Sequence, residues 1–222
     1  MKWWSRLWRN STVAHRESSQ WVRITLPGWN EDTSNRDSRT WRDIDGDLLS
    51  LDIPTEAFHL PNEELELTRW CRELAQRRRA GLIEARAVDS GIRPSVRLVY
   101  KRLQIRAYVY TGMFISHVEG FTLVWTIVAG ERGTTGVREA VVTSNLMNAG
   151  KLTLDDYRRG WARDPYEPAY QGVDRSVLRF ISDDESYDEQ FPQHPLSKVR
   201  RVLRALPAAI QLHTQKPQSS IS

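Results

Sequence analysis

The stretches SVRLVYKRL (95–103), RAYVYTGMFIS (106–116) and GFTLVWTIVA (120–129) decide the fold of this chain. All three are rich in β-branched and aromatic residues, and in the last one large apolar side chains alternate with threonine and valine, which is typical of strands. Residues 82–88 share this character. Because only a few residues separate consecutive segments, we expect neighbouring antiparallel strands without crossover helices.

The N-terminal part of the chain supplies further strands. Residues 21–26 alternate between apolar and polar side chains and end at a Pro-Gly turn signal, so a strand is predicted there, followed by a polar loop over residues 29–38. Residues 40–43 and 47–53 flank Asp45–Gly46, which is the commonest signal for a two-residue hairpin. The sequence therefore predicts a hairpin before the central strands.

Apolar residues at helical spacing predict helices outside this run of strands. The first helix runs from Asn62 to about Ala80, the second lies between Gly136 and Gly150, and the last begins near Pro195. A short helix is expected over residues 153–159, and residues 164–192 are rich in loops. The apolar stripes of the three main helices are Leu67, Trp70, Cys71 and Leu74; Val137, Ala140, Val141, Ser144 and Met147; and Leu196, Val199, Leu203 and Leu206.

This order of elements predicts an α+β fold in which an antiparallel sheet is flanked by helices as an α/β/α sandwich. The expected organisation is a basic, Trp-rich segment and linker at 1–20, an α+β domain at 21–150, a loop-rich and helical extension packed on the domain at 151–212, and a disordered tail at 213–222.

Composition limits the class of protein. The 222 residues are 40% hydrophobic and 27% charged, which is ordinary globular usage. The 32 basic residues are nearly balanced by 28 acidic ones, so a nucleic-acid partner is not expected. No apolar run approaches the roughly 18 residues of a spanning helix, and the N-terminus lacks the apolar core of a signal peptide. Cys71 has no second cysteine to pair with, which is compatible with a reducing cytosol, so we expect a cytoplasmic protein.

One segment has the composition of an anion site. The residues Arg132, Gly133, Thr134, Thr135, Gly136 and Arg138 join a strand to a helix, where backbone N–H groups can hold a phosphate and an arginine can assist. The segment matches neither the dinucleotide-binding pattern nor the P-loop pattern. A tight turn that caps the helix is the alternative reading.

Other chemistry is not indicated. The five histidines are scattered without metal-ligand spacing, Cys71 lies on the apolar face of a predicted helix, and no serine-nucleophile motif is present. We therefore expect no metal and no cofactor. The acidic residues of 183–189 lack the pattern of a calcium loop, and we interpret them as a solvated surface, as a segment that docks on the basic face of the last helix, or as a charged edge for a partner.

The N-terminal segment carries a separate signal. Trp3, Trp4, Leu7 and Trp8 share one helical face, while Lys2, Arg6 and Arg9 lie outside it. Such a basic amphipathic segment can lie on a membrane, enter the groove of a partner, or fold back on its own domain.

The stretch WVRITLPGW (21–29), the Asp45–Gly46 hairpin and the helix start GTTGVREA (133–140) together resemble PsbP-like and DcrB-like domains over residues 21–150. The segments WARDPY (161–166) and YDEQFPQHPLS (187–197) are similar to segments of uncharacterised bacterial proteins. The resemblance implies a sheet between helices and a binding role such as that of an adaptor, chaperone or immunity-type protein.

The residues thus favour a non-catalytic module that binds a protein or peptide over an enzyme. Two alternatives stay open: a nucleotide-binding or small-molecule-binding domain or enzyme that uses the turn from Gly130 to Arg138, and a peripheral membrane protein anchored by residues 1–9. The oligomeric state is not indicated.

Overall fold

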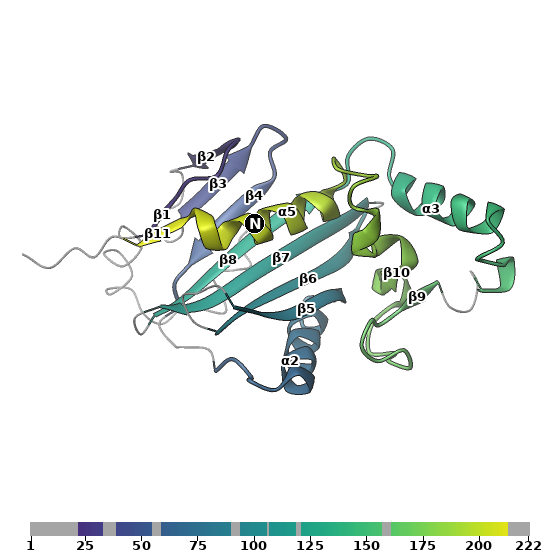
Figure 1. Cartoon of the computed structure of the whole chain (residues 1–222), viewed down its shortest axis with the longest axis horizontal. Coiled ribbons are helices and arrows are strands. Elements are labelled where there is room, and N and C mark those ends of the chain that lie inside the picture. Colours follow the sequence, from purple (N-terminus) through teal and green to yellow (C-terminus); the bar gives the residue numbers. More distant parts are fainter. Residues whose placement is uncertain are drawn as a thin grey trace, which may run out of the picture.

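The computed structural model describes residues 22–32, 39–54, 59–89, 94–105, 107–118, 121–156 and 161–212. In this part of the chain an antiparallel seven-stranded sheet has the order β2-β3-β4-β8-β7-β6-β5 (Figure 1). The strands are β2 (Trp29–Asp32), β3 (Arg39–Asp43), β4 (Leu48–Asp52), β5 (Gly81–Asp89), β6 (Pro94–Gln104), β7 (Ala107–Val118) and β8 (Phe121–Gly130). The predicted run of antiparallel strands is confirmed, since β5, β6, β7 and β8 pair in chain order.

Two predictions near the N-terminus need correction. The strand predicted over residues 21–26 is shorter, because β1 (Val22–Ile24) leaves the main sheet and pairs with β11 (Ile210–Leu212). Residues 29–32, predicted as part of a loop, form the edge strand β2. Opposite charges across the β2–β3 pair support this strand, with Arg39 Nε at 2.8 Å from Glu31 Oε1.

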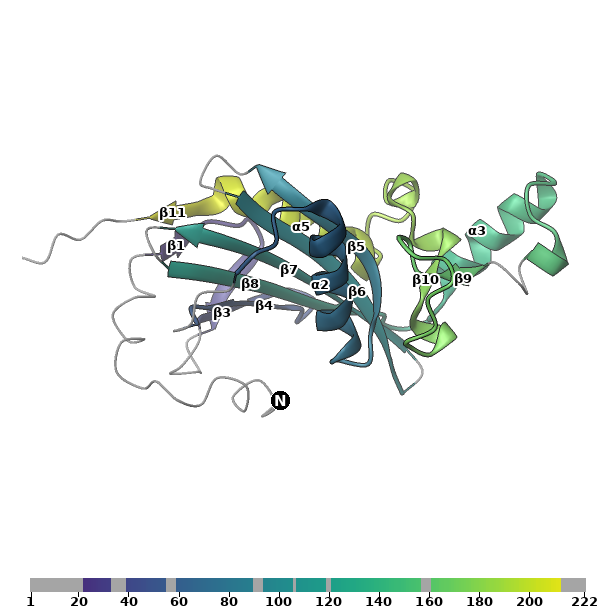
Figure 2. The same cartoon turned by 90° about the horizontal axis from the view of Figure 1, so that it is seen from below.

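The sheet carries one long helix on each face, as Figures 1 and 2 show together, so the predicted α/β/α sandwich is confirmed. Helix α2 (Glu64–Gln76) packs Leu67, Cys71 and Ala75 against strands β5 to β8. Helix α5 (Pro195–Ala209) packs on the opposite face, and Gly112 of β7 allows its close approach, because a Cβ there would lie 2.6 Å from Leu203 Cδ1. The buried apolar residues of α5 are Leu196, Val199, Val202, Leu203 and Leu206.

Helix α3 (Val137–Asn148) projects beyond the end of the sheet in both views. Between α3 and α5 the chain forms β9 (Ala162–Arg163), the 3₁₀ turn η2 (Arg175–Val177), β10 (Arg179–Phe180), η3 (Ile181–Asp183) and η4 (Glu185–Tyr187). A small core of Val142, Leu152, Trp161 and Phe180 joins α3 to this segment. Of the short helix predicted over 153–159, residues 154–156 are helical and 157–160 lie outside the described residues.

None of the helices described here is both long enough and apolar enough to cross a membrane. Residues 1–21 and 213–222 lie outside the described residues, so the structure does not address the predicted Trp-rich segment or the predicted disordered tail.

Candidate functional site

The turn predicted to hold an anion is built around a carboxylate of the chain itself. Glu131 Oε2 accepts the Tyr108 N–H at 3.0 Å, and Glu131 Oε1 accepts the Gly136 N–H at 3.1 Å. Burial alone would raise the pKa of Glu131, but the hydrogen bond from His194 and those from the two amides outweigh it and lower that pKa. Thr134 is exposed, and Gly133 and Gly136 adopt positive φ, as the alternative reading of a tight turn requires.

The two arginines of this turn do not converge on one site. Arg132 Nη2 lies 2.6 Å from Asp47 Oδ1 on the β3–β4 hairpin. Arg138 is buried and points to the other side, where Nε donates to the Ser182 carbonyl at 2.6 Å and Nη1 to Ser197 Oγ at 2.8 Å. Both guanidinium groups thus bind acceptors of the chain itself, and neither arginine contributes to an anion site. The site therefore stays a prediction over the residues Arg132, Gly133, Thr134, Thr135, Gly136 and Arg138.

Arg138 fastens α3 to the rest of the molecule. In addition to the bonds that Nε and Nη1 make to Ser182 and Ser197, Nη2 of Arg138 donates to the Asp184 carbonyl at 2.8 Å and lies 3.0 Å from Asp188 Oδ1. Ser182 lies in η3, Ser197 lies in α5, and Asp184 and Asp188 are the residues that flank η4, so one buried side chain ties the base of α3 to all three elements. A buried arginine with several hydrogen-bond acceptors is a structural anchor, since leaving its charge unpaired would be costly.

The recess beside this anchor is small. It is lined by Tyr108, Tyr110, Glu131, Gly136, Arg138, Glu139, Phe180, Ser182, Asp183 and His194, and it has room for about one water molecule. His194 Nδ1 accepts the Leu196 N–H at 3.2 Å and caps α5, which gives this histidine a structural role. The recess therefore offers no space for a nucleotide, although titratable groups surround it.

Three aspartates of the β3–β4 hairpin form a second charged cluster. Asp43, Asp45 and Asp47 each offer a carboxylate oxygen, all within 4.8 Å of one another, which is a spacing that suits a metal ion. Lys198 of α5 takes that place: its Nζ lies 2.9 Å from Asp43 and 2.7 Å from Asp47 and also contacts Asp45. Burial opposes the charge of Lys198, but hydrogen bonds to the three carboxylates outweigh it and raise its pKa. The cluster holds α5 to the hairpin.

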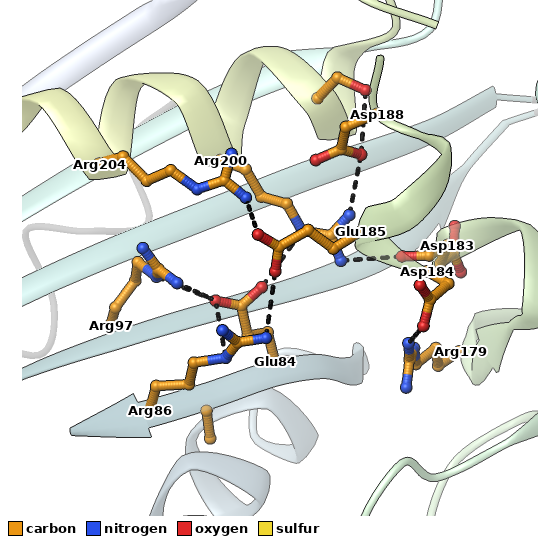
Figure 3. Close-up of polar contacts among 12 residues, drawn as sticks. Glu84, Arg86, Arg97, Arg179, Asp183, Asp184, Glu185, Asp188, Arg200 and Arg204 are labelled. Carbon is orange, nitrogen blue, oxygen red and sulfur yellow. Dashed lines mark hydrogen bonds and ion pairs between the residues drawn. The ribbon is translucent and has the colours of Figure 1, made fainter. Parts of the chain in front are cut away.

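A third cluster, drawn in Figure 3, joins β5 and β6 to α5 and the turns before it. The buried Glu84 of β5 lies 2.8 Å from Arg97 Nη2 and 3.2 Å from Arg200 Nε. Arg200 continues to Asp188 at 3.0 Å and donates to the Asp183 carbonyl at 2.8 Å. The interpretation that the acidic segment 183–189 docks on the last helix is confirmed, and that of a solvated surface is wrong for Asp183, which is buried.

The segment before η3 wraps the edge of the sheet at β5. Asp164 accepts a hydrogen bond from Arg72 of α2 at 3.0 Å. Tyr166 Oη accepts the N–H of Ala85 at 2.6 Å and donates to its carbonyl at 2.9 Å, so one side chain satisfies both backbone groups of an edge-strand residue. Together with the ion pairs, these contacts fasten residues 161–188 as a platform on which α3 packs.

The outer face of α3 differs from every surface described above because it carries no charge. The exposed residues of this helix are Val137, Ala140, Val141, Ser144, Asn145 and Asn148, and the two valines are 45% and 40% exposed. The only charged residues of α3 are Arg138, which is buried, and Glu139, which accepts a hydrogen bond from Trp161 Nε1 at 2.9 Å. The apolar stripe predicted from the sequence is real, but apart from Met147 it faces outward.

The remaining predictions concern single residues. Cys71 is a residue of α2 and is buried against the sheet, and burial raises the pKa of its thiol to about 12, so it is a structural residue and not a nucleophile. Among the described residues the groups close enough to hold a metal are the three aspartates that bind Lys198. Trp3, Trp4, Leu7 and Trp8, predicted as partner or membrane contacts, lie outside the described residues.

Comparisons with known proteins assign no family to the chain. No protein-family model and no curated protein matches it. Among solved structures, the chain is similar to the Ran-binding protein Mog1p of Saccharomyces cerevisiae, with 8% sequence identity and a TM-score of 0.37, over 74% of this chain and 96% of that chain. A likeness this distant carries no argument, so the function has to be inferred from the geometry of the chain.

Proposed function

We propose that this chain is a non-catalytic protein-binding module and that its partner docks on the outer face of α3. The observation that carries the proposal is the absence of charge on that face. A solvent-facing helix normally carries lysine and glutamate, because they keep it hydrated and prevent association. In α3 the exposed positions are instead valine, alanine, serine and asparagine.

The shape of this surface indicates the chemistry of the partner. Helix α3 projects from the body of the molecule, so a partner can reach its flanks as well as its crest (Figure 1). A helix of 12 residues is about 18 Å long, and flat contact between two of them falls well short of the roughly 800 Å² per partner of a stable interface. A groove that encloses the helix buries more area, as in helix-in-groove recognition.

The partner groove must also lack charge. A lysine or glutamate in it would lose water without gaining a counter-ion from the α3 face, which is unfavourable. We therefore expect an apolar groove of helix width on a different protein, with pockets for Val137 and Val141, which lie one helical turn apart. An adaptor, a chaperone or an immunity-type protein would each use such a contact.

The test combines crosslinking with reconstitution. The photoreactive amino acid benzoylphenylalanine replaces Val141 in the full chain, and in a matched control it replaces Leu65, which is 71% exposed on α2. In the native cell, position 141 should crosslink to one protein of defined mass and position 65 should not. The purified partner should then bind the purified chain, and Val141→Glu should weaken binding at least tenfold, whereas Leu65→Glu should not.

Three results would overturn the proposal. Equal crosslinking from both positions would show an unspecific surface. A crosslinked band at twice the mass of the chain would identify a second copy as the occupant in place of a groove. Binding of the purified partner that survives Val141→Glu would place the contact elsewhere. Val141 is exposed, so Val141→Glu should change stability by no more than about 0.5 kcal/mol, and thermal unfolding of the variant checks this.

A further inference from the structure

A second surface has a residue type that its turn does not require. Ile105, at the tip of the β6–β7 hairpin, has φ +60° and a side chain that is 93% exposed. The left-handed region is unfavourable for a β-branched residue, and glycine or asparagine would adopt it with less strain. Leu103, two residues earlier, is 46% exposed. The hairpin thus presents two large aliphatic side chains to solvent, one of them at a cost to the backbone.

Exposed arginines lie on this hairpin and on the elements beside it. Gly81, at the start of β5, is the register partner of Lys101, which brings the C-terminal turn of α2 beside the end of β6. The guanidinium carbon of Arg78 lies 5.9 Å from the ring centroid of Tyr100 on β6, and Arg102 is a residue of the same strand. Their neighbours Arg77 and Arg79 are exposed, as is Arg102.

The turn η2 adds one more arginine. Tyr108, the register partner of Leu103, donates its hydroxyl hydrogen to the Ser176 carbonyl at 2.8 Å, which holds η2 beside the hairpin. Arg175 of η2 is exposed. The exposed acidic residues beside these arginines are Glu73, which lies 4.0 Å from Arg77, and Asp174, which caps η2 by accepting the Ser176 N–H. Among the exposed residues, the four arginines Arg77, Arg79, Arg102 and Arg175 outnumber these two acidic residues, which leaves the surface positive. Glu131, which accepts the Tyr108 N–H, has a side chain that is only 6% exposed.

The geometry points to an anionic lipid bilayer as the ligand of this surface. We call it the hairpin-tip surface, and its residues are Arg77, Arg78, Arg79, Arg102, Leu103, Ile105 and Arg175. Protruding aliphatic side chains with arginines behind them suit a membrane interface, where Ile105 and Leu103 enter the acyl boundary and arginines meet headgroup phosphates. A nucleic acid would use the arginines but offers no apolar layer to the protruding Ile105. This surface is distinct from residues 1–9 and from the α3 face.

The first test measures binding of the full chain to vesicles. Vesicles of phosphatidylcholine mixed with phosphatidylserine should float the protein, and vesicles of phosphatidylcholine alone should not. Ile105→Asn, which suits the left-handed backbone, should weaken binding about tenfold or more without loss of stability. Arg102→Gln should weaken it about fivefold and should flatten its dependence on salt.

The β3–β4 hairpin offers a matched control. Ile44 is 98% exposed at the tip of that hairpin but lies between Asp43 and Asp45, so Ile44→Asn should leave vesicle binding unchanged. A full-chain variant with Trp4→Ser and Trp8→Ser should also keep its vesicle binding. The proposal is overturned if phosphatidylserine vesicles do not bind at low salt, or if Ile105→Asn binds as the unsubstituted chain does. Loss of binding in the tryptophan variant with full binding in Ile105→Asn would move the contact to the N-terminal segment.

Discussion

The ion pair between Lys101 and Asp183 allows the sharpest test of how the clusters stabilise the fold. Lys101 Nζ lies 2.6 Å from Asp183 Oδ2, the two side chains are 0% and 2% exposed, and the ring of Phe180 is 3.2 Å from the same nitrogen. Burial lowers the pKa of Lys101, and the charge of Asp183 opposes this shift. Asp183→Asn would leave a buried ammonium without its counter-ion, which costs about 3–5 kcal/mol.

A second variant separates the charge from the rest of the packing. In the double variant Lys101→Met with Asp183→Asn neither charge is present, and the asparagine can still accept the Phe180 N–H, as Asp183 does at 2.8 Å. Replacing both partners of a buried pair is often neutral, so the free energy of unfolding should return to within about 1–2 kcal/mol of the unsubstituted protein. The two substitutions should therefore couple by about 3 kcal/mol or more.

Urea unfolding at neutral pH, followed by circular dichroism, measures this coupling if the dependence on urea is the same for all variants. In thermal unfolding Asp183→Asn should lower Tm by roughly 6–20 °C, since 1 kcal/mol corresponds to about 2–4 °C for a chain of this size. A loss below about 1 kcal/mol for Asp183→Asn, or a double variant no more stable than the weaker single variant, would refute the reasoning that the pair is buried and mutually dependent.

Two further predictions concern packing and pH. Gly112→Ala should lower the free energy of unfolding by about 1–3 kcal/mol in the same urea assay, because its Cβ would overlap Val199 and Leu203 of α5; an unchanged midpoint would contradict this contact. Burial raises the pKa of Asp52 from 3.8 to about 6, so between these values the folded protein binds the extra proton. Stability should therefore fall by about 2–3 kcal/mol as the pH rises through this window, and Asp52→Asn should remove that dependence.

Elements with a strong periodic signal could be predicted from the sequence. The strands β5 to β8 and helix α5 agree with expectation within a few residues, because each buries one face and the apolar pattern records that face. The short strands β1 and β2 were missed or misplaced. Strand β1 forms by pairing with β11 (Ile210–Leu212), which lies almost two hundred residues away in the sequence. A local pattern of three residues cannot predict such a partner.

Apart from the docking of residues 183–189 on the last helix, the charged clusters were missed for a different reason. Lys101 is in phase with the buried Val99 on β6, which was a signal that it faces inward, but the sequence does not show that Asp183 meets it there. Arg138 illustrates the same limit. Its position at a helix start suggested an anion, and the anion it meets is Asp188, supplied by a segment whose path the sequence does not reveal.

The placement of charge distinguishes the two proposed surfaces from the rest of the molecule. Arg138, Lys198 and Arg200 each pair with acidic residues of another element, so these charges join elements inside the fold. Because its one buried cation is used in this way and its glutamate bonds Trp161, α3 shows an uncharged crest to solvent. The hairpin tip has the opposite arrangement, because exposed arginines on β6 and the elements beside it outnumber exposed acidic residues, and Ile105 protrudes next to them. A contact driven by burial of apolar surface is therefore expected at α3, and one that salt weakens is expected at the hairpin tip.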